Sequence, residues 1–230
     1  SILEAGVFFK RLLDLPALLE QKSYFLFGPR ATGKTSLIRN QFPEEVPVLD
    51  LLENKLYLRL SSAPDELESI ILGHGDPSIV IIDEVQRIPD LLNEVHRLIE
   101  KTGIHFLLTG SSARKLRRSQ ANLLAGRARQ AELFPLTSIE IPNFDLERYL
   151  QYGGLPMVYQ SDEPVDDLHA YVNTYLKEEI QAEALVRQLP AFTRFLKFSA
   201  LTSGEMLSFT NIANDSAVPA STVREYYTIL

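Results

Sequence analysis

One segment decides the fold, Gly28-Pro-Arg-Ala-Thr-Gly-Lys-Thr35, and it fits the P-loop pattern G-x-x-x-x-G-K-[ST]. The two glycines let the backbone turn tightly and bring its N–H groups up to phosphate oxygens. The helix that opens after such a loop favours negative charge at its N-terminus. Lys34 can reach the β- and γ-phosphates and take part in catalysis, and the Thr35 hydroxyl can bind Mg²⁺. The predicted nucleotide-binding residues are Gly28, Pro29, Arg30, Ala31, Thr32, Gly33, Lys34, Thr35 and Ser36.

The segments on either side of this loop support the same interpretation. Residues 24–27 are Tyr-Phe-Leu-Phe and read as a short buried strand, and residues 36–40 can continue as a helix. A strand before the loop and a helix after it are the context that a P-loop requires. An unrelated glycine-rich turn, which is the alternative, would require neither.

A second informative stretch is Ser78-Ile-Val-Ile-Ile-Asp-Glu84. Its run of β-branched residues predicts a strand that is buried on both faces of a parallel sheet. Ligands of open α/β sheets bind beyond the carboxyl ends of the strands, which is where the two acids lie. We predict that Asp83 holds Mg²⁺ and that Glu84 orients or deprotonates the attacking water. The alternative is a pair of surface acids that form ordinary ion pairs.

Residues 104–109 predict another buried strand, which ends at Thr109-Gly-Ser-Ser112. A polar side chain at this position can hydrogen-bond the γ-phosphate or the lytic water. We favour Ser111 or Ser112 for this catalytic role, with Thr109 behind them. The alternative is simple turn chemistry by glycine and serine.

Between Thr102 and Ala131 the sequence has basic residues and no acidic ones. One arginine of this span can act as a finger that stabilises charge on the transferring phosphoryl group. Arg127 is the first choice, because the preceding Gly126 would help it project from a loop, and Arg129 and Arg114 come next. Contact with nucleic-acid phosphates is a second interpretation. A solvated basic face is a third.

Five predicted strands alternate with helices, which indicates a doubly wound α/β domain with a parallel sheet over residues 1–136. Helices follow over residues 137–205, where Phe192 and Phe195 are expected to lie in a core and not in a cofactor site. Residues 206–230 resemble the start of a helix-turn-helix, with Ser221 and Thr222 where base or phosphate contacts are usually made. Modules of this kind also serve protein contacts.

The composition excludes or disfavours several other kinds of protein and binding site. The 230 residues contain no cysteine, which rules out disulfides and thiolate metal sites. No apolar run approaches the ~20 residues that a membrane helix needs, so no membrane partner is expected. The net charge of −7 argues against polyanion binding by the whole surface, although a local basic patch remains compatible with it.

The motif set resembles the prokaryotic AAA-type P-loop ATPases that have an ATP-binding domain, a helical and winged-helix segment and a C-terminal domain of unknown function. The matching segments are 28–35, 81–89, 107–115, 123–127 and Tyr152-Gly-Gly-Leu-Pro156. The resemblance implies a cytoplasmic ATPase with Mg²⁺ at Thr35 and Asp83, Glu84 as the catalytic acid and a sensor within residues 109–112. Members are usually longer, so this chain is expected to be an N-terminal fragment.

Two functions follow as hypotheses. The first is an ATP-hydrolysing switch or motor, whose arginine finger would act in a homo-oligomer or on a protein partner. The alternative is a nucleotide-gated DNA-binding module with little hydrolysis. A small-molecule kinase would need a lid and an acceptor pocket, and no segment marks either. A GTPase is disfavoured because Tyr57 stands in Asn54-Lys-Leu-Tyr57 where a guanine-reading Asp would be expected.

Overall fold

The computed structural model describes residues 8–111, 116, 124–176, 180 and 188–229. The chain folds into two compact units, Ser1–Pro164 and Val165–Leu230, and each unit is described by itself. The sequence predicts domain boundaries at residues 136 and 205, whereas the two compact units divide after Pro164. As boundaries of functional domains, the two positions stay predictions.

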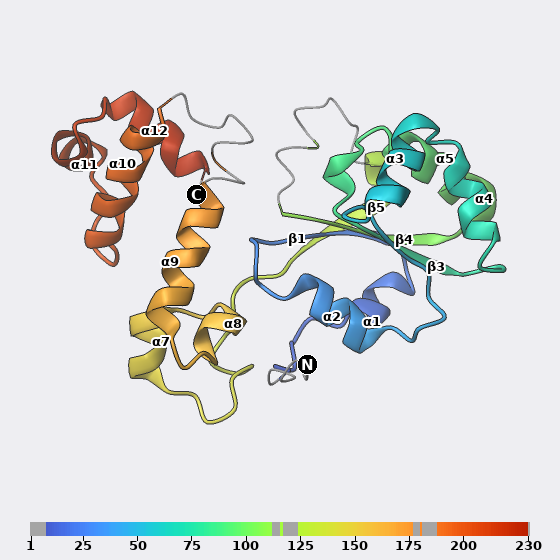
Figure 1. Cartoon of the computed structure of the whole chain (residues 1–230), viewed down its shortest axis with the longest axis horizontal. Coiled ribbons are helices and arrows are strands. Elements are labelled where there is room, and N and C mark those ends of the chain that lie inside the picture. Colours follow the sequence, from blue (N-terminus) through green and yellow to red (C-terminus); the bar gives the residue numbers. More distant parts are fainter. Residues whose placement is uncertain (1–7, 112–115, 117–123, 177–179, 181–187, 230) are drawn as a thin grey trace. The chain divides into compact units, whose positions relative to one another are not determined.

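The first unit is built on a five-stranded sheet in which all paired neighbours are parallel (Figure 1). Its order is β2-β3-β4-β1-β5. The strands are β1 (Ser23–Phe27), β2 (Val48–Asp50), β3 (Ile79–Asp83), β4 (His105–Gly110) and β5 (Ala128–Glu132). The prediction of a parallel five-stranded α/β sheet is therefore confirmed.

Helices cover both faces of the sheet, as a doubly wound fold requires. On one face lie α1 (Leu15–Leu19) and α2 (Lys34–Gln41), and on the other lie α3 (Asn54–Ser62), α4 (Glu66–Leu72) and α5 (Leu91–Thr102) (Figure 1). Asp14 caps α1 by accepting a hydrogen bond from the Ala17 N–H, and Pro16 occupies the first turn, where its missing N–H costs nothing.

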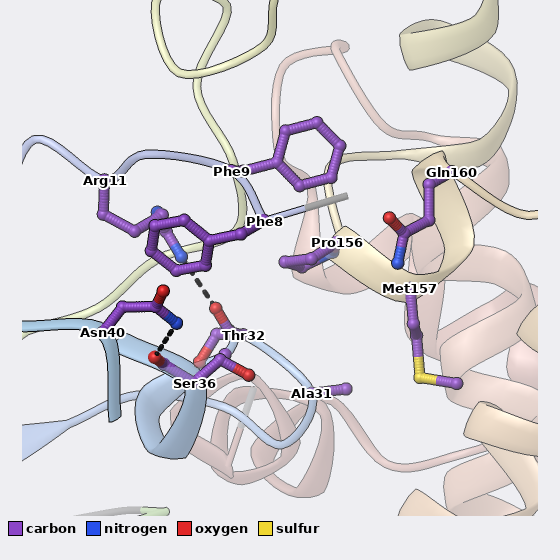
Figure 2. Close-up of a pocket in the computed structure, with 11 residues that line it drawn as sticks. Phe8, Phe9, Arg11, Ala31, Thr32, Ser36, Asn40, Pro156, Met157 and Gln160 are labelled. Carbon is purple, nitrogen blue, oxygen red and sulfur yellow. Dashed lines mark hydrogen bonds between the residues drawn. The ribbon is translucent and has the colours of Figure 1, made fainter. Parts of the chain in front are cut away.

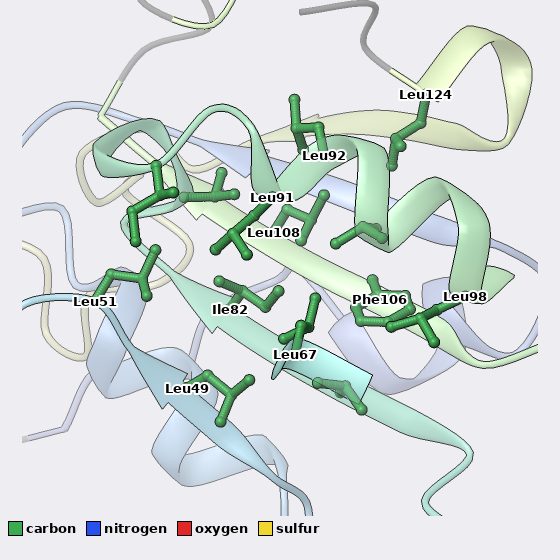
Figure 3. Packing of buried hydrophobic residues seen from close by; sticks show 14 of the residues in the cluster. Leu49, Leu51, Leu67, Ile82, Leu91, Leu92, Leu98, Phe106, Leu108 and Leu124 are labelled. Carbon is green, nitrogen blue, oxygen red and sulfur yellow. The ribbon is translucent and has the colours of Figure 1, made fainter. Parts of the chain in front are cut away.

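Successive side chains of a strand point to opposite faces of the sheet. Side chains of one strand therefore pack alternately against the two helix layers. Ile82, Phe106 and Leu108 pack in the larger core cluster with residues of α4 and α5 (Figure 3). Ile81 and Leu107 pack with α1 and α2 in a second cluster. This double burial explains why β3 and β4 read as nearly continuous apolar runs.

Short elements complete the first unit. They are the 3₁₀ turns η1 (Val85–Arg87) and η2 (Leu124–Gly126) and the helices α7 (Leu146–Tyr152) and α8 (Pro156–Tyr159). Phe9, Leu136, Ile141 and Tyr159 form a small cluster of their own, which brings the N-terminal segment against the chain that follows β5.

The regular elements in the described part of the second unit are helices. Its helices are α9 (Pro164–Tyr175), α10 (Leu189–Leu201), α11 (Phe209–Ser216) and α12 (Ala220–Ile229). Phe192 and Phe195 are fully buried and pack with Val223 and Tyr226, which confirms that these aromatics are core residues. Within the described residues, no helix of either unit has the length and apolarity to cross a membrane.

Candidate nucleotide-binding site

The loop between β1 and α2 has the backbone geometry that its glycines predict. A Cβ at Gly28 would lie 2.3 Å from the Leu133 carbonyl oxygen, so only glycine fits there. Gly33 caps α2 with φ +91°, a left-handed conformation that glycine adopts without strain. Ala31 also has a positive φ, of 61°, although it is not a glycine. The loop therefore holds unusual backbone angles directly before a helix N-terminus.

The two predicted metal ligands lie together. The Thr35 hydroxyl donates a hydrogen bond to Asp83 Oδ2 at 3.1 Å, across 48 residues of sequence. Parallel strands place all their carboxyl ends at one edge of the sheet, which is why the end of β3 faces the loop that follows β1. The acids at 83 and 84 are thus on the same edge as the P-loop.

Thr109 joins both acids to β4. Its fully buried hydroxyl donates to Asp83 Oδ1 and accepts a hydrogen bond from the Glu84 N–H at 3.1 Å. From the sequence we place Thr109 behind Ser111 as the residue that contacts the γ-phosphate or the lytic water. Ser111 is half-buried and directly follows β4. Ser112 and Arg114 lie outside the described residues. The sensor role of the serines stays a prediction.

Glu84 is held in a conformation that is rare for its residue type, with φ 61° and ψ 42°. The amide of Gln86 donates a hydrogen bond from Nε2 to Glu84 Oε2. Gln86 itself is buried, and its Oε1 has no hydrogen-bond partner among the described residues. Strained backbone and an unsatisfied buried polar atom both concentrate at functional sites.

The environment also changes the acidity of Glu84. Burial raises the pKa of its carboxyl group, and the neighbouring charge of Asp83 raises it further. The charges of Lys34 and Arg30 and the hydrogen bond from Gln86 oppose this rise but do not cancel it. The net result is a carboxylate with a pKa above its ordinary value, and therefore a stronger base.

Lys34 lies against the loop that carries it. Its Nζ donates hydrogen bonds to the carbonyl oxygens of Gly28 at 2.7 Å and Pro29 at 3.0 Å, and the residue is only 8% exposed. Its charge also lowers the pKa of Glu84, as expected for an ammonium near that carboxylate. The predicted reach to β- and γ-phosphates stays a prediction.

The donor set fits Mg²⁺ bound together with phosphates. Mg²⁺ prefers oxygen ligands and usually takes only one or two from carboxylates, the remainder coming from water and phosphate. Thr35 and Asp83 supply a hydroxyl and a carboxylate in contact. The described residues contain no cluster of three or more His, Cys, Asp or Glu that would form a cage made of protein alone.

A cavity of about 450 Å³ adjoins the P-loop (Figure 2). Its walls come from the N-terminal segment, the loop and α2, and the residues at α8. They are Phe8, Phe9, Arg11, Ala31, Thr32, Gly33, Ser36, Asn40, Pro156, Met157 and Gln160. The sequence alone did not single out Phe8, Phe9, Met157 or Gln160. The Tyr152–Pro156 turn was the local signal that could have pointed to one wall.

Arg127 lies away from this site. It directly precedes β5, whose first residue Ala128 pairs with Ser23 at the amino end of β1, whereas the P-loop follows the carboxyl end. Five strand residues separate the two edges by about 15 Å. Arg127 forms an ion pair with Glu100 of α5. It therefore cannot act on a phosphate bound at its own P-loop, and a role as a finger would require a neighbouring subunit.

Residues 20–141 match the AAA domain family, to which the chain belongs. Residues 143–230 match a domain of unknown function. Uncharacterized proteins of Mycobacterium bovis and Mycobacterium tuberculosis are each 28% identical over 208 residues, which cover 87% of this chain and 46% of theirs. The chain thus spans about half the length of these relatives.

One similar solved structure is the Aeropyrum pernix ORC1 protein in complex with DNA. The TM-score is 0.39 and the sequence identity 13%, covering 90% of this chain and 76% of that one. A likeness this distant carries no argument about function.

Proposed function

We propose that this protein binds ATP with Mg²⁺ at the edge formed by the P-loop and the end of β3, and hydrolyses it as a nucleotide-dependent switch or motor. The observation that carries the proposal is the contact of Thr35 with Asp83 beside the strained, half-buried Glu84. AAA family membership supports nucleotide binding.

Each residue of the site has a role in this reaction. The backbone N–H groups of the P-loop, which Pro29 lacks, and the Lys34 ammonium bind the phosphates. Thr35 and Asp83 would hold Mg²⁺, which would offset the negative charge of the phosphates. Glu84 orients the attacking water and accepts its proton, for which its raised pKa suits it. Ser111 or Ser112 would contact the γ-phosphate.

The cavity beside the P-loop is the proposed subsite of the adenine base. Its volume of about 450 Å³ falls within the range of small-ligand pockets. Phe8, Phe9 and Met157 provide apolar surface for a flat ring, and the amides of Asn40 and Gln160 provide polar groups at its margin (Figure 2).

Replacing Glu84 by Gln tests the hydrolytic role. The variant keeps the shape of the side chain but cannot accept a proton, so we expect ATP binding to persist and turnover to fall by about 10²-fold or more. Binding is measured with a fluorescent ATP analogue and turnover by phosphate release. The exposed Glu20→Gln serves as the matched control. Persistent turnover in Glu84→Gln would show that another residue is the base.

A nucleotide-gated DNA-binding module is the second candidate. Two helices joined by a short turn, α11 and α12, support it, with the exposed Ser221 near the beginning of α12. It differs from the first candidate in one measurable respect, because wild-type turnover would then be slow or absent while ATP still bound.

A further inference from the structure

Three segments that are far apart in the sequence meet at the guanidinium of Arg11. Its Nε donates to Glu140 Oε1 at 3.0 Å, and its two terminal nitrogens donate to the carbonyl oxygens of Thr32 at 2.7 Å and Phe134 at 2.6 Å. Arg11 is only 8% exposed. Because the guanidinium is planar and all three of its nitrogens donate hydrogen bonds, the buried side chain is held in one orientation.

Glu140 is fixed just as firmly. Its Oε1 also accepts a hydrogen bond from the Leu12 N–H at 2.9 Å, and its Oε2 accepts from the Thr137 N–H at 3.0 Å and the Thr137 hydroxyl at 3.2 Å. Although burial opposes it, these N–H donors and the Arg11 charge keep the pKa of Glu140 below its ordinary value. The carboxylate is therefore ionised and anchors the guanidinium.

The bond to Thr32 matters because Thr32 is part of the P-loop. In a planar trans peptide the C=O and the following N–H point in opposite directions. A guanidinium that holds the Thr32 carbonyl on one side therefore turns the Gly33 N–H to the other side. Figure 2 shows Arg11 reaching Thr32 beside the cavity. The Gly33 peptide is one of those that a P-loop directs at phosphate oxygens.

Arg11 lines one wall of the cavity and is connected to the opposite wall by hydrogen bonds. It lines the cavity together with Phe8 and Phe9 of its own segment. Arg11 binds the Phe134 carbonyl. Two residues further along the chain, the Leu136 N–H donates a hydrogen bond to the Gly154 carbonyl at 2.7 Å. Gly154 is two residues before Pro156, which lines the other wall.

We propose that Arg11 and Glu140 are a positioning pair that presets the Thr32–Gly33 peptide for a triphosphate and joins the P-loop to both walls of the cavity. The inference rests on the proposed nucleotide binding and assigns a specific part of it to two residues outside the motifs. If the pair had only a structural role, replacing it by apolar residues would leave ligand affinity unchanged. A buried ion pair can often be replaced in this way without loss of stability.

The test is the double variant Arg11→Met/Glu140→Leu in the full chain. It removes both charges together, so neither charged group is left without its partner, although the backbone groups that the two side chains bind lose these hydrogen bonds. Affinity for ATP and for inorganic tripolyphosphate is measured by calorimetry, and the unfolding midpoint in urea is recorded beside it. Arg194→Met is the matched control, since Arg194 also donates to a backbone carbonyl, that of Ser216 in the second unit.

We expect both ligands to bind at least about 10-fold more weakly to the double variant, while the control binds as wild type does. Wild-type affinity in a folded double variant would overturn the inference. If the unfolding midpoint falls, Arg11→Lys becomes the variant that decides, because it keeps a charge opposite Glu140 but cannot reach both carbonyls. Weakened binding by folded Arg11→Lys supports the pair, and unchanged binding overturns it.

The failure of this inference differs from that of the proposed function. A wild-type chain that binds neither ATP nor tripolyphosphate would overturn the proposed function, and this inference with it. A wild-type chain that binds both ligands, with variants that bind equally well, would overturn the positioning role alone.

Discussion

At the scale of single residues, Glu84 is under several local constraints. Its backbone is left-handed, its N–H is held by Thr109, and its carboxylate is held by Gln86. The surrounding structure must stabilise such a conformation, since a non-glycine residue there costs of order 1–3 kcal/mol. The constraint fixes where the carboxylate lies and, through burial and Asp83, how readily it ionises.

Gln86→Leu should move the pH dependence of turnover. A general base must be ionised, so turnover rises as pH increases through the pKa of Glu84, which lies above the ordinary 4.5. The Gln86 hydrogen bond lowers that pKa. Its loss should raise the pKa, and the acid limb of kcat/KM against pH should shift to higher pH. Gln130→Leu, on the exposed surface of β5, is the control; an acid limb that stays in place in Gln86→Leu would contradict the assignment.

Among the elements, the turn between α11 and α12 has an uncommon feature. Helices often end with a glycine in the left-handed conformation. Here Ala217 adopts it, with φ 53° and ψ 46°. Val218 follows and is buried, packing with Ile212 and Val223. Packing in the second unit therefore imposes the turn on a residue that disfavours it.

Ala217→Gly should stabilise this helix pair. A left-handed alanine costs about 1–2 kcal/mol, and glycine removes that strain while losing more entropy on folding. We expect a net gain of about 0.5–1 kcal/mol, measured as slower amide hydrogen exchange in α11 and α12. Ala213→Gly, inside α11, should destabilise the pair by a similar amount. Faster exchange in Ala217→Gly would contradict the described turn.

For the whole molecule, the central question is whether one chain contains the complete site. The P-loop, Asp83 and Glu84 share one edge of the sheet, whereas Arg127 lies at the other. A finger at that position could serve only a site in a neighbouring subunit. The predicted role of Arg127 therefore implies an assembly in which two subunits complete each site.

Mixing two inactive variants tests this arrangement. Arg127→Ala would lack the finger and Glu84→Gln would lack the base, so each alone should turn over at least about 10²-fold more slowly than wild type. In a mixture, some interfaces combine an intact base with an intact arginine, and turnover should recover as total protein concentration rises. Full activity of Arg127→Ala alone would contradict the finger assignment. Arg129→Ala is the comparison, because Arg129 was the next choice.

The sequence by itself determined the fold class and the centre of the site. The P-loop spacing and the apolar runs of β3 and β4 are local patterns, and a parallel sheet brings the ends of its strands to one edge. Thr35 and Asp83 could therefore be paired from the sequence alone, although 48 residues separate them.

Only the tertiary structure decided the remaining contacts. Arg11 and Glu140 are 129 residues apart, and neither belongs to a pattern. The role of Thr109 and the position of Arg127 depend on strand register, which residue types alone do not specify. The physical reason is that a local pattern records which residues are buried, whereas the partner of a buried polar group is set by which distant segments pack together.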